Sequence, residues 1–277
     1  MTYVTKADRS KQSFDKEKVV RTCLRMRASE EIARKVANKV ESKIYDGIST
    51  KKILQMIFSY LKDYKPDVRY RIDLRTAISL LRGKPDFEQF VAIILRELGY
   101  KVITNQMIRG KCVEHEIDAV ATKTDEIVYV EAKHHFQPHT YTGLDTVLET
   151  NSVFEDLLDG FKLKKHTTNF NTAMIVCNTK YSDHAKDYAN CRGIVHLGWK
   201  SPEKNSLEDI VEKNKLYPIT FLKTLDVSEH EKLCDNGIIL LHQLIDSDVN
   251  KLWKKTKISK ERLQRLIANA REIVEKS

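Results

Sequence analysis

The segment Gly83-Lys84-Pro85 separates two parts of the chain that carry different hydrophobic patterns. Before it, apolar residues recur every three or four positions, which is the period of an amphipathic helix. After it, apolar stretches of strand length alternate with helical stretches. A glycine and a proline this close together interrupt helices and strands alike. We therefore expect a domain boundary here, between residues 1–82 and residues 83–225.

Residues 1–82 are predicted to form a small four-helix domain with one β edge. We expect Ser13 to cap the first helix and Ser29 to cap the second, because each serine precedes a helical run of apolar residues. Pro66 interrupts the pattern of the third helix. Proline is tolerated in the first turn of a helix, so we expect a fourth helix from there to about Leu81.

Residues 83–225 have the element order of a mixed sheet flanked by helices. Three consecutive strands make a meander, and helical crossovers then lead into two further strands. The predicted elements are a helix at 86–98, strands at 100–108, 112–122 and 126–135, a helix at 142–165, a strand at 172–176, a helix at 182–191 and a strand at 194–196. Residues 226–277 are predicted to be helical. The expected fold class is therefore α/β, in the broader sense α+β, with three domains.

The composition excludes several classes of protein. No apolar stretch approaches the roughly 20 residues that a membrane helix needs, and the first residues lack the apolar core of a signal peptide. The five cysteines are odd in number and form no Cys-x-x-Cys pair, which argues against a disulfide framework and a zinc ribbon. We expect a soluble, cytoplasmic protein without a membrane partner.

The formal net charge of +9 is unevenly distributed along the chain. Residues 1–82 hold 20 Lys and Arg against 10 Asp and Glu, whereas residues 83–226 hold 18 against 21. A basic surface attracts polyanions, so the first third is expected to bind nucleic acid or a nucleotide. Composition alone does not choose between the two.

Two carboxylates and a lysine are predicted to meet in the central sheet. Side chains alternate along a strand, so Glu131 and Lys133 share one face. If the second and third strands of the meander pair through their short turn, Asp118 converges with Glu131 beside Lys133. Carboxylate oxygens suit Mg²⁺, and a nearby ammonium can orient an attacking water or stabilise charge on a phosphate oxygen.

This arrangement resembles the PD-(D/E)xK nuclease superfamily, specifically its Mrr-like restriction-endonuclease branch, over about residues 85–200. The resemblance implies a metal-dependent endonuclease that hydrolyses DNA, with Mg²⁺ or Mn²⁺ held by Asp118, Glu131 and Glu88. Glu88 would be the helix acid that completes the site, and Lys133 would be the catalytic lysine. One departure is that the glycine-rich run before the aspartate is reduced to Gly110.

Other polar residues near this motif are given structural roles. Glu-x-Lys alone is usually a solvated ion pair, but here an upstream Asp, a helix Glu and the element order accompany it. His134, His135 and His139 match no zinc-ligand spacing, so we expect them to contact substrate or to serve structure rather than to bind a metal. Two further groups are expected to serve structure or solvation: Asp67 and Asp86 at helix starts, and Asp145, Glu149, Glu155 and Asp156 on a solvated helix face.

Residues 2–82 resemble an ATP-cone, a regulatory nucleotide-binding module. The resemblance rests on Val4-x-Lys6, on Phe14-Asp15 followed by Lys18, and on Tyr70-Arg71. It implies that ATP or dATP is bound by residues that include the basic pair one turn apart on the first helix. The residues implied to line the nucleotide site are Val4, Lys6, Lys18 and Arg21. A basic helical DNA-binding bundle without nucleotide is the alternative.

Residues 226–277 weakly resemble a helix-hairpin-helix unit, whose hairpin amides contact DNA phosphates. The glycine expected in the hairpin is replaced by Ser259. Packing or dimerisation is the alternative for this segment. For the whole chain we expect a nucleotide-regulated DNA endonuclease that forms a homodimer. Two alternatives are an inactive, nucleotide-sensing DNA-binding protein and a structure-specific or RNA-directed nuclease.

Overall fold

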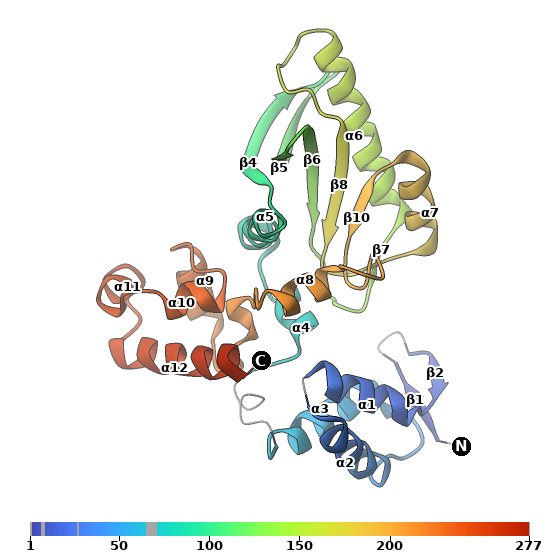
Figure 1. Ribbon diagram of the computed structural model, residues 1–277, viewed down its shortest axis with the longest axis vertical. Helices are drawn as coiled ribbons and strands as arrows, with labels where there is room; N and C mark the ends of the chain where they lie inside the picture. The colour runs from blue at the N-terminus through green and yellow to red at the C-terminus, as the bar shows by residue number, and fades with distance from the viewer. Residues whose placement is uncertain (1, 7–8, 27, 65–70, 277) are drawn as a thin grey trace. The chain divides into compact units, whose positions relative to one another are not determined.

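A computed structural model describes residues 2–6, 9–26, 28–64 and 71–276 of the chain (Figure 1). The chain forms two compact units. One comprises residues 1–72, 222–226 and 244–277, and the other comprises residues 73–221 and 227–243. Within the described residues, no helix is both long enough and apolar enough to span a bilayer.

The N-terminal part of the first unit is a small sheet with three helices. The strands are ordered β2-β1-β3, with β2 antiparallel and β3 parallel to β1. Their buried apolar side chains share one core with those of the helices, including Val4, Val36 and Ile57. The elements are β1 (Tyr3–Thr5), β2 (Lys11–Ser13), α1 (Lys16–Arg25), α2 (Glu30–Glu41), β3 (Ile48–Ser49) and α3 (Thr50–Leu61).

The caps of these helices test two of the predictions. Ser29 caps α2 as predicted, with its hydroxyl accepting from the Ile32 amide. The prediction for α1 was wrong, because Ser13 ends strand β2 and Asp15 is the N-cap. Asp15 is the better cap because its carboxylate accepts from the amides of residues 17 and 18 and also carries the negative charge that a helix N-terminus favours.

The fourth helix expected in this part begins later than predicted and has different neighbours. It is α4 (Leu74–Ser79), and it belongs by its contacts to the second unit. Asp73 caps it. The predicted start at Pro66 lies outside the described residues.

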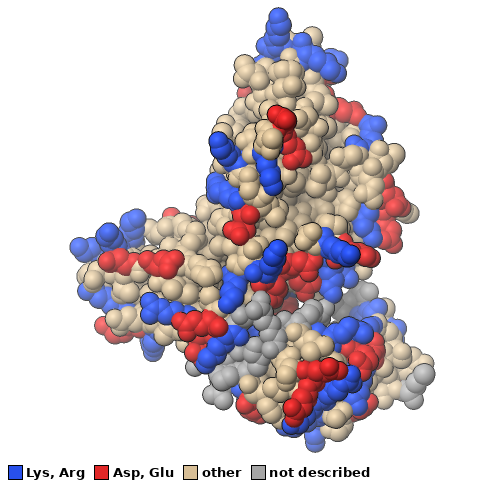
Figure 2. Space-filling model, in the orientation of Figure 1, with Lys and Arg blue, Asp and Glu red and all other residues tan. Residues whose placement is uncertain are grey.

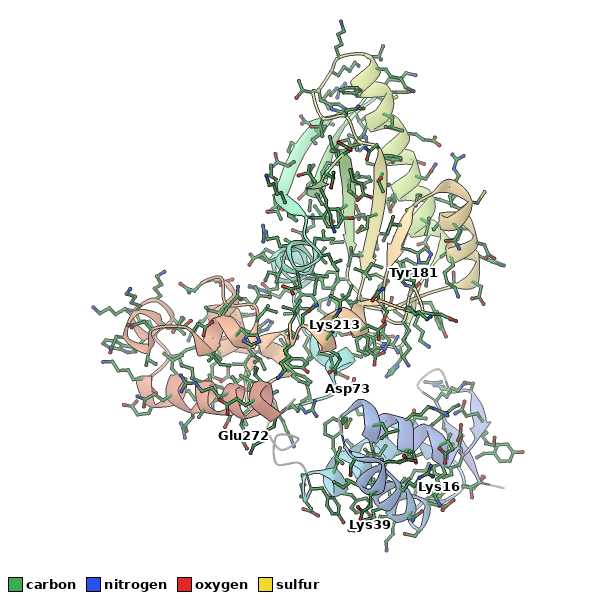
Figure 3. The ribbon with its side chains drawn as sticks, viewed as in Figure 1. Lys16, Lys39, Asp73, Tyr181, Lys213 and Glu272 are labelled. Atoms are coloured by element: carbon green, nitrogen blue, oxygen red, sulfur yellow. The ribbon has the colours of Figure 1, made fainter. Side chains whose placement is uncertain are left out.

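On the surface of α2, the Lys39 ammonium lies 5.7 Å from the ring centres of Tyr60 and Tyr64 (Figure 3).

The second unit is built on the predicted mixed sheet of five strands, in the order β10-β8-β6-β5-β4. The meander β4–β5–β6 is antiparallel, whereas β6, β8 and β10 are parallel to one another. The strands are β4 (Lys101–Arg109), β5 (Glu114–Lys123), β6 (Glu126–Lys133), β8 (Thr172–Cys177) and β10 (Val195–Leu197). A two-residue parallel ladder joins β7 (Tyr141–Thr142) to β9 (Lys180–Tyr181) and was not predicted.

Helices cover both faces of this sheet. Helix α5 (Glu88–Glu97) packs against β4 and β5, and a short kinked turn (Gly83–Phe87), in which Lys84 is extended, precedes it. Helices α6 (Leu144–Lys162) and α7 (Asp183–Arg192) lie on the other side and share a core with residues of β5, β6 and β8 (Figure 1). Within that core the Tyr181 hydroxyl donates to the Ile175 carbonyl (Figure 3).

The remaining described elements are helical, in line with the prediction for residues 226–277. Helix α8 (Leu207–Lys213) was not predicted, and a 3-10 turn (Ile219–Phe221) follows it. Lys257 takes a left-handed conformation, φ 59°, and ends the helix before it. The C-terminal helices are α9 (Val227–Cys234), α10 (Leu241–Ile245), α11 (Val249–Thr256) and α12 (Lys260–Lys276).

A close backbone approach fixes the loop between β4 and β5 against helix α6. A Cβ atom at Gly160 of α6 would lie 2.8–2.9 Å from backbone atoms of Arg109 and Gly110. Backbone atoms cannot rotate away as the end of a flexible side chain can. Gly160 therefore allows this loop to lie directly on α6, next to the point where β5 begins.

We predict that Gly160→Ala destabilises the protein although alanine is the better helix former. The propensity gain is about 1 kcal/mol, whereas forced overpacking costs about 1–3 kcal/mol, and the upper end is expected here because the opposing atoms are backbone. Urea denaturation should show a lower free energy of unfolding. Ser152→Ala at an exposed position of the same helix is the control, and a Gly160→Ala variant as stable as that control would contradict the prediction.

Candidate active site

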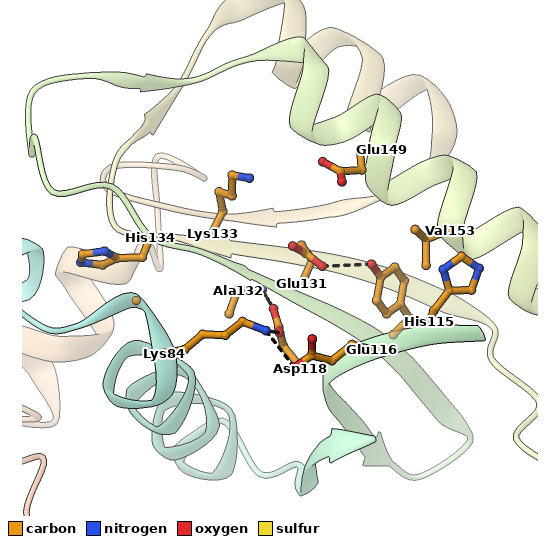
Figure 4. Close-up of a pocket in the computed structure, with 12 residues that line it drawn as sticks. Lys84, His115, Glu116, Asp118, Glu131, Ala132, Lys133, His134, Glu149 and Val153 are labelled. Atoms are coloured by element: carbon orange, nitrogen blue, oxygen red, sulfur yellow. Dashed lines mark hydrogen bonds and ion pairs between the residues drawn. The ribbon is translucent and has the colours of Figure 1, made fainter. Parts of the chain in front are cut away.

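Charged side chains gather in one pocket, where the first residues of β5 lie beside the last residues of β6 (Figure 4). The pocket has a volume of about 430 Å³, and the chain segments that line it are the turn before α5, strands β5 and β6, and helix α6. Its charged lining residues are Lys84, Glu116, Asp118, Glu131, Lys133 and Glu149. Asp118, Glu131 and Lys133, which the sequence analysis singled out, therefore lie in one pocket.

Asp118 lies where β5 separates from β6. Backbone pairing of the two strands ends at Ala119 and Val130. One step further on, the Asp118 carboxylate accepts a hydrogen bond of 2.8 Å from the Ala132 amide. The side chain thus replaces the backbone partner that this amide would have in a continuing ladder, which avoids an unpaired N–H group. Asp118 is only 7% exposed, and the hydrogen bond from the Ala132 amide orients its carboxylate.

Glu131 is the pocket acid whose protonation responds to pH near neutrality. Burial and the negative charge of Asp118 raise its pKa to about 7. The Tyr129 hydroxyl donates to Glu131 over 3.1 Å, which favours the ionised form but does not outweigh the burial. A buried carboxylate with a raised pKa is typical of sites that bind a cation or transfer a proton.

Lys84 was assigned no chemical role by the sequence analysis, yet its ammonium lies among three carboxylates. The Nζ atom is 3.0 Å from Glu116, 3.2 Å from Glu88 and 3.4 Å from Asp118. Burial disfavours the charged ammonium, but the bonds to Glu116 and Glu88 and the charge of Asp118 outweigh it and raise the pKa of Lys84. Because side chains alternate along a strand, Glu116 and Asp118 lie on the same side of β5, and both contact Lys84 (Figure 4).

Glu88 lies behind the pocket rather than on its wall. It is 5% exposed at the first turn of α5, and Lys84 contacts it from the pocket side. Burial and the charge of Asp118 raise the pKa of Glu88. A carboxylate whose pKa is raised by a neighbouring negative charge is stabilised in its charged form by a cation that enters beside it.

Lys133 and Glu149 lie on the same side of β6 as Glu131 (Figure 4). Among the described residues, the Lys133 ammonium makes no ion pair. Glu149 belongs to α6 and is exposed, as expected for a solvated helix face, but it also lines the pocket, which was not predicted. Helical periodicity alone does not reveal that this turn of α6 passes over the open end of β6.

Asp156 was also assigned to the solvated face, and the structure corrects this. Its carboxylate accepts from the amides of residues 112 and 113 and lies 2.8 Å from His115 Nε2. Burial opposes ionisation, but the hydrogen bonds from His115 and from the Cys112 amide lower the pKa of Asp156. This side chain therefore ties α6 to the start of β5.

The histidines after Lys133 have protein partners of their own. The His134 ring lies 5.1 Å from the ring of Phe87. His135 Nε2 is 3.1 Å from the Thr142 hydroxyl, and His139 Nδ1 is 3.1 Å from Arg75. The three rings thus serve different contacts and do not form a common ligand set.

The residues implied for nucleotide binding lie on β1, on the turn after it and on α1. Val4 is buried in the core at 3% exposure. Lys18 Nζ is 3.4 Å from the Gln12 amide oxygen, and Arg21 is 3.3 Å from the Asp15 carboxylate. Lys6 follows β1 and is exposed.

Known proteins share this architecture. The crystal structure of a protein of unknown function, AF1548, superimposes with a TM-score of 0.59 at 34% identity and covers 69% of this chain and 97% of its own. An uncharacterized protein of Archaeoglobus fulgidus is 35% identical over 184 residues, which are 66% of this chain and 99% of the relative. This chain belongs to the same family.

Family models match three parts of the chain in the expected order. Residues 2–77 match the ATP cone domain, residues 83–197 match the restriction endonuclease domain of the Mrr type, and residues 217–274 match the AF1548-like C-terminal domain. This chain therefore carries a PD-(D/E)xK-type nuclease domain with an ATP cone before it. The C-terminal match names neither a helix-hairpin-helix nor a ligand.

We predict that Glu131→Gln stabilises the metal-free protein at pH 8 but not at pH 5. The pKa of Glu131 is about 7 in the folded state against a usual 4.5. The folded state therefore binds the extra proton between these values, and stability falls as the pH rises through this window. Glutamine avoids the loss, which we expect to be about 1–3 kcal/mol.

Urea denaturation in EDTA at both pH values measures this difference. Tyr129 can still donate to the amide oxygen of the glutamine, so the variant keeps that hydrogen bond. Glu114→Gln, at an exposed position of β5, is the control and should show no comparable gain. An equal effect of Glu131→Gln at pH 5 and pH 8 would count against a raised pKa at this position.

Proposed function

We propose that the chain is a metal-dependent endonuclease that hydrolyses phosphodiester bonds in DNA, with the pocket at the end of β5 and β6 as its active site. The observation that carries the proposal is the convergence of Asp118, Glu131 and Lys133 in one open pocket, with Glu88 directly behind it. The match of residues 83–197 to the restriction endonuclease domain supports the same activity.

The carboxylates of this pocket fit a divalent cation. Two of them, Glu116 and Asp118, together with Glu88 behind the pocket, already surround one cation, the Lys84 ammonium, at 3.0–3.4 Å. We propose that Asp118, Glu131 and Glu88 hold Mg²⁺ or Mn²⁺. Such an ion supplies Lewis-acid activation of the phosphate and lowers the pKa of a bound water.

The protein's own residues would prepare the reaction in the following way. Lys133 carries a positive charge with no ion-pair partner among the described residues, so it is available to a phosphate oxygen or to the attacking water. Tyr129 holds the Glu131 carboxylate in place. The Ala132 amide does the same for Asp118, so both acids are oriented before a substrate arrives.

We predict that Lys133→Met and Glu131→Gln each reduce DNA cleavage at least 100-fold, because each removes a group that acts at the reacting phosphate. DNA affinity should change much less, since phosphate contacts elsewhere supply most of it. Plasmid incubated with Mg²⁺ or Mn²⁺ and resolved on agarose measures nicking and linearisation, and a fluorescent duplex measures binding.

Lys101→Met on β4, at an exposed position outside the pocket, is the matched control for the lost charge. Undiminished cutting by both pocket variants would remove the assignment. No cutting by the unaltered protein, with DNA binding retained, would favour the inactive DNA-binding alternative. Cleavage of RNA or of branched DNA instead of plasmid would favour a structure-specific or RNA-directed nuclease.

We further propose that ATP or dATP binds the ATP cone and regulates cleavage. Ion pairs with acidic side chains already engage several basic residues of this part, such as Lys16 with Glu41 and Lys35 with Glu31. On the side of the molecule that Figure 2 shows, Lys and Arg are accordingly mixed with Asp and Glu. A discrete nucleotide site suits such a surface better than a long DNA track does.

We predict that calorimetry on the full chain detects binding of ATP or dATP. Lys6→Ala and Lys18→Ala should each weaken this binding about tenfold, since a lost phosphate contact is worth about 1–2 kcal/mol. Lys16→Ala on the same helix is the control. Binding of neither nucleotide at millimolar concentration would favour the basic DNA-binding bundle. Nucleotide binding without any change in cleavage or in oligomeric state would remove the regulatory part.

A homodimer is part of this proposal because one pocket acts on one strand at a time. Two copies of the chain would bring two pockets to a duplex, and closed twofold dimers are the commonest soluble oligomers. In the plasmid assay a dimer should yield linear product early, whereas a monomer should accumulate nicked circles first.

A further inference from the structure

Three potential metal ligands of the second unit lie together outside the catalytic pocket. Asp86 belongs to the turn before α5, and His230 and Cys234 belong to α9. Their ligand atoms all lie within 4.8 Å of one another, and all three residues are buried. None of them lines the pocket that contains Asp118 and Glu131.

The two residues of α9 are spaced to bind one ion. His230 and Cys234 are four positions apart on a helix, so their side chains lie one above the other on the same face. Asp86 approaches this face from a segment about 150 residues earlier in the chain. Two ligands one helical turn apart, closed by a third from a distant segment, are a common way to build a metal site.

His230 has a buried nitrogen that lacks a proper hydrogen bond. The residue is 7% exposed, and Nε2 lies 3.2 Å from Asp86 Oδ2 without the alignment of a hydrogen bond. A buried polar atom left in this state is costly. A separation near 3.3 Å is that of two ligand atoms bound to one tetrahedral ion through bonds of about 2.0 Å.

The Asp86 carboxylate is held in place by Arg82. The guanidinium donates to both carboxylate oxygens over 2.7 and 2.8 Å, and it also donates to Asp235 over 2.7 Å. Carboxylate ligands of metals are typically oriented by such outer hydrogen bonds. Asp86, which was expected to serve a helix start, therefore has the environment of an oriented ligand.

The charges of the cluster balance with a divalent ion present. Arg82 offsets Asp235, with which it is paired. The remaining carboxylate of Asp86 and a thiolate at Cys234 together offset one doubly charged ion. The thiol proton leaves to solvent when the ion binds, and the His230 ring stays neutral.

We propose that Asp86, His230 and Cys234 form a zinc site that fastens helix α9 to the turn preceding α5. A thiolate and an imidazole select zinc over Mg²⁺ or Ca²⁺, which prefer oxygen ligands. A water molecule would complete the tetrahedron, since the described residues contribute three ligands. Because Glu88 follows Asp86 by two residues, the ion also stiffens the segment that brings Glu88 and Lys84 to the catalytic pocket.

The test is the metal content of the full chain, purified without chelator or a histidine tag and then reloaded with zinc. We expect about one tightly held zinc ion per chain. Cys234→Ser and His230→Gln should lose it. Cys191→Ser, which alters an exposed cysteine, and Glu131→Gln, which alters the catalytic pocket, should keep it.

Cobalt replacement gives a second readout that does not depend on activity. A cobalt-loaded protein should show the near-ultraviolet thiolate-to-cobalt absorption, and Cys234→Ser should abolish it while its circular dichroism stays native. Removing zinc should lower the thermal midpoint of the unaltered protein and leave that of Cys234→Ser unchanged. This outcome is separate from cleavage, so the zinc site stands or falls independently of the nuclease proposal.

Two results would overturn the site. If the reloaded protein contains only trace zinc and its thermal midpoint does not change with the metal, the cluster is a contact between His230 and Asp86 that binds no ion. If zinc is retained in both Cys234→Ser and His230→Gln, the ion is bound elsewhere on the chain.

Discussion

The candidate active site depends on the point where two antiparallel strands stop pairing. Beyond Ala119 and Val130 the backbone ladder of β5 and β6 ends, and the Asp118 carboxylate takes over the Ala132 amide. Where this side chain replaces a backbone partner, the strands separate and a pocket lies at the end of β6. Asp118 forms part of the wall of that pocket. The hydrogen bond from the Ala132 amide also keeps Asp118 near enough to Glu131 to raise the pKa of the latter. A continuous ladder would have satisfied the same amide but left no space for a substrate.

Much of this arrangement could be predicted from the sequence because it depends on strand periodicity. The meander, the crossover helix and the parallel strands follow from alternating apolar residues and from turns at known spacings, and their bounds differ from the observed ones by a few residues. The short elements were harder. The ladder of β7 and β9 has two residues in each strand, too few for any period, and α8 spans only seven residues.

The residues missed at the site share one property, which is that a distant segment determines their role. Glu149 looks like any acid on a helix surface until α6 is placed over β6. Asp156 looks the same until its helix meets the loop held against Gly160. Asp86 follows a proline and resembles a helix cap, yet it is buried beside Arg82 and α9. Sequence periodicity shows which residues of a helix or strand share a face. It does not show which other element packs against that face.

Lys84 gives the acidic pocket its own counter-ion. Glu88, Glu116 and Asp118 all lie within 3.4 Å of one ammonium, on a side chain that is 58% exposed and attached just before α5. Acids drawn this close would repel one another as the chain collapses, or would have to take up protons. With the lysine between them, the sheet and α5 can pack together with less of this repulsion. The folded chain can therefore hold these acids together without a metal ion, because it carries its own cation between them.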